Sequence, residues 1–406
     1  MRGMILRRSP ERGAVAMMVA ILFGTGVFFG CAALTLDVGN INADRRQLQN
    51  GADAAVLSAA ADCAKTTCPA SGDAGLANLA NKNAADGATK IARVDGQGPA
   101  VCGSGPGLVA CPSSAAPNTG NLQECPAVTI PSAATGYVRV YTQTLNASRT
   151  QTILPYSFGA ALAGAGSGAN QQTCAAAAWG PAGVAPILPF TFSMCEWYHD
   201  TYQDTDPNDL VPPANYAPFR PVDDNKNNPW EHAVALNSAP DAGCTAWQNH
   251  DFPGGFGWLD YDPATCKILD PINNWYAGDT GVGAGNQCGA KIQAAVGHVV
   301  YLPVFDCADD DQRRLPCAGN LPNGTNVWYH VKGAAAFFLT GVEITGQLNK
   351  SLPGYPKSAA KAECKADASG NKKCLYGWFL SDLVDPSAGL DGGALDLGIK
   401  AVQVIG

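Results

Sequence analysis

A long apolar run lies near the N-terminus of the chain. Residues 14–36 are uncharged and largely apolar throughout. An α-helix rises about 1.5 Å per residue, so a helix of this length is enough to cross a hydrocarbon core of about 30 Å. The pattern therefore predicts a transmembrane helix over residues 14–36.

Apolar positions continue after this run at three- and four-residue spacing. Within residues 37–65 this spacing predicts an extracytoplasmic extension of the helix, to about residue 63. The stripe is narrow and most of its side chains are small, which favours close packing against another surface. Docking on the chain's own exported domain and contact with another molecule both remain open. The interaction residues predicted on the stripe are Leu48, Ala52, Ala55 and Ala59.

The remainder of the chain has shorter patterns. Residues 66–135 are rich in Ala, Gly, Pro and Ser and show little periodicity, which predicts an irregular segment. Residues 160–178 are small, apolar and interrupted by glycine, which predicts a short helix or a buried loop. Residues 136–406 are expected to form a β-rich exported domain, with strand patterns at 137–141, 150–154, 187–194, 299–305 and 327–344.

The charges on either side of the apolar run predict its orientation. Four arginines and one acid, Glu11, precede the run, whereas Asp37 follows it directly. The positive-inside rule makes residues 1–13 a cytoplasmic tail and places everything after Asp37 outside the cell membrane. A cleaved signal peptide and a lipoprotein acylated at Cys31 are alternatives for the same residues, and both also export the remainder.

The chain contains 15 cysteines and no CxxC motif that would suggest a metal site. So many cysteines therefore indicate an oxidising compartment. Cys31 lies inside the apolar run, which leaves an even number of cysteines for disulfides. The expected fold class is therefore α+β, with a transmembrane helix extended into a long helix and followed by a β-rich, disulfide-stapled extracytoplasmic domain. Close spacing suggests the local pairs Cys63 with Cys68, Cys307 with Cys317, and Cys364 with Cys374.

The remaining composition argues against several classes of function. The net charge of -8 and the absence of a basic run after residue 50 argue against a nucleic-acid partner. The sequence contains no HExxH, GxSxG or P-loop pattern. We therefore expect no catalytic residues, no cofactor and no enzymatic activity.

Aromatic residues gather between residues 197 and 275, where strand signals are few. They are candidates for stacking on sugars or for contact with a protein partner. The alternative is that most of them are core residues beneath long loops. The interaction candidates in this region are Trp230, Trp247, Trp258 and Trp275.

An acidic cluster offers an incomplete set of calcium ligands. Its carboxylates belong to Asp306, Asp309, Asp310 and Asp311. Calcium prefers oxygen ligands, but this cluster lacks the alternation and the distal glutamate of an EF-hand. The alternative is a solvated loop closed by a Cys307–Cys317 bridge.

Three motifs surround the apolar run: RG before it, LDVG at its outer end, and RRQLQNGADAAVLSAAA after it. With these motifs, residues 12–61 resemble the N-terminal module of TadE/TadG-like proteins of Tad (tight adherence) or Flp pilus-assembly systems. The resemblance implies a membrane-anchored assembly component or minor pilin with a structural or adhesive role. It also implies other pilus or secretion-system components as partners, and a glycan, host or abiotic surface as an outer contact.

Residues 254–260, Cys266, Cys288, residues 302–304 and residues 329–341 are similar to Tad-like exported proteins of high-GC Gram-positive bacteria. No DxSxS sequence is present, so the metal-dependent adhesion domain of larger TadG-type relatives is not expected. No glycine stands five residues before a glutamate at the start of the run, so cleavage by a prepilin peptidase is not expected either. The alternative function is an anchored or secreted extracellular hydrolase or carbohydrate-binding protein with the same N-terminal module.

Overall fold

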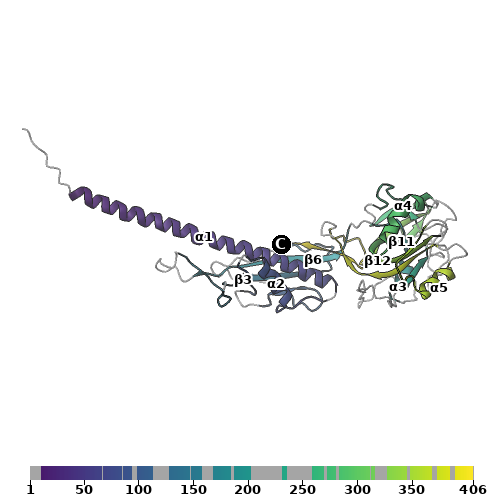
Figure 1. Ribbon diagram of the computed structural model, residues 1–406, viewed down its shortest axis with the longest axis horizontal. Helices are drawn as coiled ribbons and strands as arrows, with labels where there is room; N and C mark the ends of the chain where they lie inside the picture. The colour runs from purple at the N-terminus through teal and green to yellow at the C-terminus, as the bar shows by residue number, and fades with distance from the viewer. Residues whose placement is uncertain are drawn as a thin grey trace, which may run out of the picture.

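The computed structural model combines one long helix with a largely β-rich remainder (Figure 1), which confirms the α+β class. We use "proximal lobe" for the second half of the helix with the sheet it covers, and "distal lobe" for the sheet and helices beyond. The structure describes residues 11–65, 67–84, 86–93, 98–112, 128–146, 148–157, 168–183, 187–202, 231–235, 258–268, 272–279, 283–310, 312–315, 327–344, 348–367, 373–384 and 389–405.

Helix α1 runs without interruption over Glu11–Lys65. No proline occurs within this segment, so no helical hydrogen bond is lost to a missing N–H. The predicted apolar and extracytoplasmic helices are therefore parts of one element. Its C-terminal end is closed by the Cys63–Cys68 disulfide. Among the described residues, no helix meets the length and hydropathy expected of a membrane span.

The proximal lobe is built on a six-stranded sheet, counted over the described residues. Its order is β1-β3-β6-β16-β15, and β2 also pairs with β3. Helix α2 (Ala74–Lys82), from within the segment 66–135, packs beside α1. The strands are β1 (Thr89–Ile91), β2 (Val101–Ser104), β3 (Gly136–Thr144), β6 (Gln172–Pro181), β15 (Asp382–Leu383) and β16 (Ile399–Val404).

Strand β6 corrects one prediction. A short helix or a buried loop was expected over residues 160–178, but from Gln172 onward this segment is a strand in the middle of the sheet. All ten residues of β6 are buried, so the strand lacks the polar alternation of a half-exposed strand. Its run of alanines also allows α1 to approach the sheet closely.

The distal lobe contains an eight-stranded sheet within the described part of the chain. The predicted strands at 299–305 and 327–344 are confirmed, whereas most of 187–194 is irregular and ends in a helix. The strands are β7 (Phe192–Ser193), β8 (His232–Ala235), β9 (Trp258–Leu259), β10 (Asn274–Asp279), β11 (Val299–Asp309), β12 (Trp328–Ile344), β13 (Leu348–Ser351) and β14 (Lys373–Leu380); the helices are α3 (Met194–Tyr202), α4 (Gly283–Ala295) and α5 (Ser358–Asp367).

The two lobes share a hydrophobic cluster. It joins Ile399 and Ala401 of β16 to Phe338 of the long distal strand β12. Nearby, the hydroxyl of Tyr301 donates a hydrogen bond to Oδ2 of Asp382 over 2.7 Å. The C-terminal strand therefore belongs to the proximal sheet while its first residues pack against the distal lobe.

Disulfides hold loops in both lobes. Cys63–Cys68 and Cys364–Cys374 are pairs that the spacing suggested, and Cys102–Cys111 and Cys266–Cys288 are further pairs. Cys307 is also disulfide-bonded, and Cys317 lies outside the described residues. Cys31 carries an exposed thiol.

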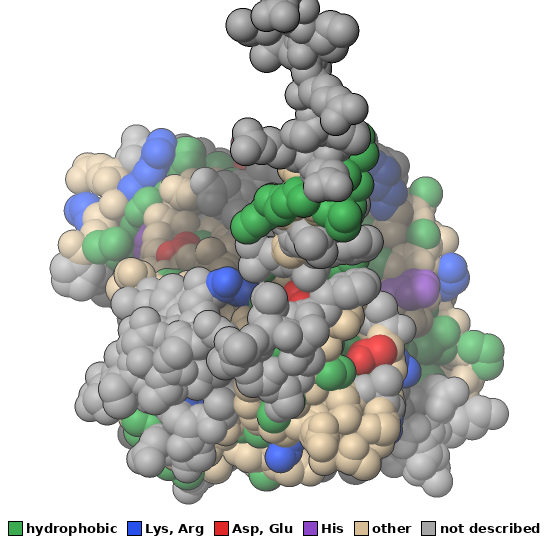
Figure 2. All heavy atoms as spheres, turned by 90° about the vertical axis from the view of Figure 1, so that its left-hand side faces the viewer, with side chains coloured by type: hydrophobic (Ala, Val, Ile, Leu, Met, Phe, Trp, Pro, Cys, Tyr) green, Lys and Arg blue, Asp and Glu red, His purple; other side chains and the backbone are tan. Residues whose placement is uncertain are grey.

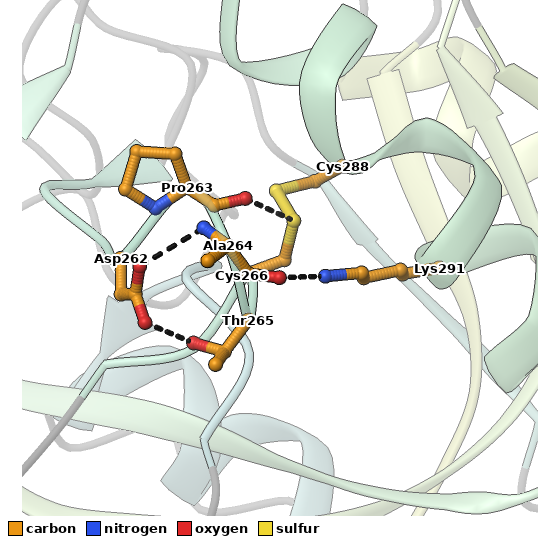
Figure 3. Close-up of a disulfide and its surroundings, with 7 residues drawn as sticks. All are labelled: Asp262, Pro263, Ala264, Thr265, Cys266, Cys288 and Lys291. Carbon is orange, nitrogen blue, oxygen red and sulfur yellow. Dashed lines mark hydrogen bonds between the residues drawn. A yellow bond between two sulfur atoms is a disulfide. The ribbon is translucent and has the colours of Figure 1, made fainter.

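The Cys266–Cys288 disulfide fastens a turn to helix α4 (Figure 3). In this turn Asp262 accepts hydrogen bonds from the backbone N–H of Ala264 and from Oγ1 of Thr265, both over 2.9 Å. These hydrogen bonds lower the pKa of Asp262. Lys291 of α4 donates to the carbonyl of Ala264, so the turn is attached to the helix by a polar contact as well.

Candidate functional site

The two halves of α1 have opposite surroundings. In the first half, large apolar side chains are exposed, and Phe23 is the most exposed at 72%. Figure 2, in which the left-hand side of Figure 1 faces the viewer, shows hydrophobic side chains on the projecting helix. The second half packs on the proximal sheet. Within residues 14–36, the exposed large apolar residues whose side chains the structure describes are Val15, Met17, Met18, Val19, Ile21, Phe23 and Leu36.

The small-residue stripe lies against the chain's own sheet. Ala52, Ala55 and Ala59 are 0% exposed, and Leu48 is buried as well. The three alanines belong to one hydrophobic cluster with residues of β3 and β6, including Ala175. Small side chains on both surfaces let the helix approach the strands closely, which maximises dispersion contacts. Of the two alternatives left open by the sequence, the structure describes the intramolecular one.

Polar contacts join the start of the packed half of α1 to the proximal sheet and to Ser157. Oδ1 of Asp37 accepts a hydrogen bond from the backbone N–H of Ser157 over 2.7 Å. One helical turn before the buried stripe begins, Oδ2 of Asp44 accepts from Oγ1 of Thr144 over 2.7 Å. Asp37 and Asp44 therefore each have a partner that lies far away in the sequence.

Further contacts extend along the helix to its C-terminal end. The hydroxyl of Thr142 donates to the carbonyl of Leu48 over 3.0 Å. At the end of α1 the ammonium group of Lys400 donates to the carbonyl of Ala64 over 3.1 Å. The positive charge of Lys400 also interacts favourably with the negative C-terminal end of the helix dipole. Together these contacts fix both the rotation and the axial position of the helix on the sheet.

Burial makes the carboxyl group of Asp44 a weaker acid than usual. Loss of hydration raises its pKa above the ordinary 3.8, the hydrogen bond from Thr144 partly offsets this, and the nearby charge of Asp86 adds to the increase. The folded-state pKa is therefore higher than the unfolded-state pKa. The stability that Asp44 contributes is complete below the unfolded pKa and is lost as the pH rises through the folded pKa.

The Asp44→Asn variant is expected to remove this pH dependence. Asparagine keeps an oxygen that accepts from Thr144 but has no charge to bury. Relative to the wild type, its free energy of unfolding should rise as the pH increases above the ordinary pKa of 3.8. Urea unfolding at a series of pH values measures this difference. Parallel profiles for the two proteins would contradict it.

The aromatic candidates occupy different environments. Trp258 is a core residue at 2% exposure, whereas Trp275 is half-buried with its ring 5.2 Å from the ring of His330. Trp230 and Trp247 lie outside the described residues. The described pair therefore does not form one common binding surface.

The acidic candidates have partners within the protein. Oδ1 of Asp306 lies 2.6 Å from Nδ1 of His330. Asp309 accepts from both Nε and Nη2 of Arg314, over 3.0 and 2.9 Å, and these hydrogen bonds hold its pKa far below the ordinary value. Asp310 also pairs with Arg314, over 3.1 Å. Asp311 lies outside the described residues, among which no group of three or more ligating side chains is placed to hold a metal.

Sequence reasoning missed the residues that receive the helix. Thr142, Thr144 and Lys400 were not predicted to have a role. A signal does exist for the threonines, because a polar TQT sequence continues an otherwise apolar strand pattern. Nothing local in the sequence indicates that Lys400 lies at the end of α1.

The helix that combines an exposed apolar half with a packed half has a counterpart among protein families. Residues 13–62 match the Tad family model, described as putative Flp pilus-assembly TadE/G-like. The match covers nearly all of α1 and ends just before its closing disulfide. Comparison with curated proteins and with solved structures finds no match.

The Tad domain implies association with pilus-assembly machinery. Tad domains are typically non-catalytic. Together with the disulfides, the domain also indicates an extracytoplasmic location, because such bonds persist in oxidising compartments. The recognition of a TadE/G-like module in the sequence is therefore confirmed for residues 13–62.

Proposed function

We propose that this chain is a membrane-anchored component of a Tad/Flp-type pilus-assembly system, acting as an assembly component or a minor pilin without catalysis. The observation that carries the proposal is that the Tad domain coincides with α1. One continuous helix has an exposed apolar half and a half that is fixed to the β-rich remainder. The role is therefore to hold a folded domain at a set position above the membrane.

The apolar half of α1 supports the anchor. Burial of apolar surface is favourable by about 25 cal/mol per Å², so the exposed side chains of residues 14–36 favour a hydrocarbon environment. Arginines precede this segment and Asp37 follows it. The N-terminus then lies in the cytoplasm and both lobes lie outside, where their disulfides are stable.

The arrangement of the lobes supports a structural or adhesive role. The distal lobe lies at the opposite end of the molecule from the projecting part of α1 (Figure 1). The packed half of α1 is held against the proximal sheet by alanine packing and by hydrogen bonds at both of its ends. The position of the helix therefore determines the position of the proximal lobe. Other pilus components, and a glycan or another outer surface, are the contacts that we propose for the exported part.

Deletion of the gene tests the proposed function. We expect cells without the protein to lose surface filaments and the wild-type gene to restore them, as counted by electron microscopy. The alternative of an anchored hydrolase or carbohydrate-binding protein predicts a normal number of filaments in the deletion strain. Normal filaments would therefore overturn the pilus-assembly role.

A further inference from the structure

A short hairpin lies where the packed half of α1 begins. Strands β4 (Leu154–Pro155) and β5 (Gly168–Ala169) form a two-stranded ribbon that is separate from both larger sheets. We propose that residues 153–157 of this ribbon form a second contact with the membrane, at the lipid headgroup boundary beside the anchor. This inference rests on the anchor in the proposed function.

One hydrogen bond to helix α1 fixes the position of the hairpin along the helix, and with it the depth of the hairpin relative to the membrane. Asp37 directly follows Leu36, the last residue of the apolar run. Its carboxylate accepts the backbone N–H of Ser157 over 2.7 Å, and Asp37 itself is only 7% exposed. One residue along a helix corresponds to about 1.5 Å, whereas the headgroup region adds about 5–7 Å on each side of the hydrocarbon core. When residues 14–36 span the core, Ser157 therefore lies at headgroup depth.

The exposed side chains of residues 153–157 are of types that suit the headgroup region. Ile153 is 36% exposed, Pro155 is exposed and Tyr156 is half-buried. Tyrosine is enriched at membrane boundaries because its ring is apolar and its hydroxyl is polar. The exposed Arg149 lies in the turn that precedes Ile153 in the chain, and its Nη2 donates to the carbonyl of Gly87 over 2.8 Å. Such a cation favours anionic headgroups.

The apolar surface of the hairpin continues that of the anchor. Leu36 is 50% exposed and Val38 is 45% exposed, on either side of the residue that binds the hairpin. A lipid surface that surrounds Leu36 therefore reaches the hairpin without any change in the fold. For this reason we assign the hairpin contact to the bilayer and not to a protein partner.

The same lobe offers a matched control at its other end. Ile130 is 45% exposed, more than Ile153. It precedes Thr135, which stands just before β3 and donates its backbone N–H to the carbonyl of Trp179 in β6. Strand β3 then runs to Thr144, which donates to Asp44. Eight residue steps in a strand cover roughly 27 Å. Ile130 is therefore an exposed isoleucine held well away from the proposed membrane surface.

Photocrosslinking of the full-length chain in vesicles tests the contact. A diazirine amino acid replaces Phe23, Ile153 or Ile130 one at a time in protein reconstituted in phosphatidylcholine and phosphatidylglycerol. Mass spectrometry then measures the lipid adducts on protein whose disulfides are intact. We expect adducts at Phe23 and at Ile153, with a yield at Ile153 several-fold above that at Ile130.

The outcomes separate this inference from the proposed function. Adducts at Phe23 with no excess at Ile153 over Ile130 would overturn the hairpin contact and leave the anchor in place. Absence of adducts at Phe23 would overturn the anchor and the hairpin contact together. Crosslinks from Ile153 to a second copy of the chain in place of lipid would also overturn the membrane contact.

Discussion

The Ala52→Glu variant is expected to destabilise the proximal lobe by about 4 kcal/mol or more. Ala52 is 0% exposed and packs within the cluster between α1 and the sheet. Glutamate is larger than the space that alanine occupies, and its charge would lose hydration in that cluster. The neighbouring alanines of β6 leave little room for adjustment, because their backbones already lie close to the helix.

Thermal unfolding of the full chain in detergent measures this effect. A loss of about 4 kcal/mol in the free energy of unfolding lowers the melting temperature of a domain as large as the proximal lobe by about 10 °C. Ala43→Glu is the matched control, since Ala43 is an exposed alanine on the same helix. The control should melt close to the wild type. Equal melting temperatures for Ala52→Glu and Ala43→Glu would show that the stripe is not packed in the folded protein.

Helix α1 is the element that the sequence predicts best, since its signals are local. An apolar run and a stripe at helical spacing depend only on neighbouring residues. The predicted end near residue 63 agrees with an observed end at Lys65. What packs on the stripe is not local information. A stripe of small residues suits packing within the chain and packing against another molecule equally well, so its composition does not distinguish the two.

The contacts that position the helix depend on distant parts of the chain. Asp44 and Thr144 are 100 residues apart, and Asp37 and Ser157 are 120 residues apart. Strand β16 pairs with β6 from the far end of the sequence. Such pairings follow from the completed sheet and not from any local pattern, so sequence reasoning did not find them.

The acidic cluster shows a similar limit. The sequence places several carboxylates close together, which is compatible with calcium. It does not show that Arg314 pairs with Asp309 and Asp310, or that His330 meets Asp306. His330 comes from β12 and Asp306 from the neighbouring β11, so their contact requires the strand pairing.

Export of the lobes without the anchor is expected to abolish filament formation. In this experiment a cleavable signal peptide replaces residues 1–36, so residues 37–406 are released outside the membrane. The packed half of α1 remains and should keep its contacts with the proximal sheet. Only the attachment to the membrane and the depth that it sets for the lobes are removed.

The effect on filaments is expected to be complete for a physical reason. An anchored protein is confined to the membrane surface, where its local concentration near other membrane components is high. Release into the surrounding volume loses this confinement and also loses the fixed orientation. Formation of the Cys266–Cys288 disulfide in the released protein is the control for correct folding.

The most direct measurement is the number of filaments per cell in a deletion strain that produces either the full-length protein or the released protein at equal levels. We expect wild-type numbers with the full-length protein and none with the folded, released protein. Wild-type numbers with the released protein would contradict the claim that α1 acts as a membrane anchor in pilus assembly.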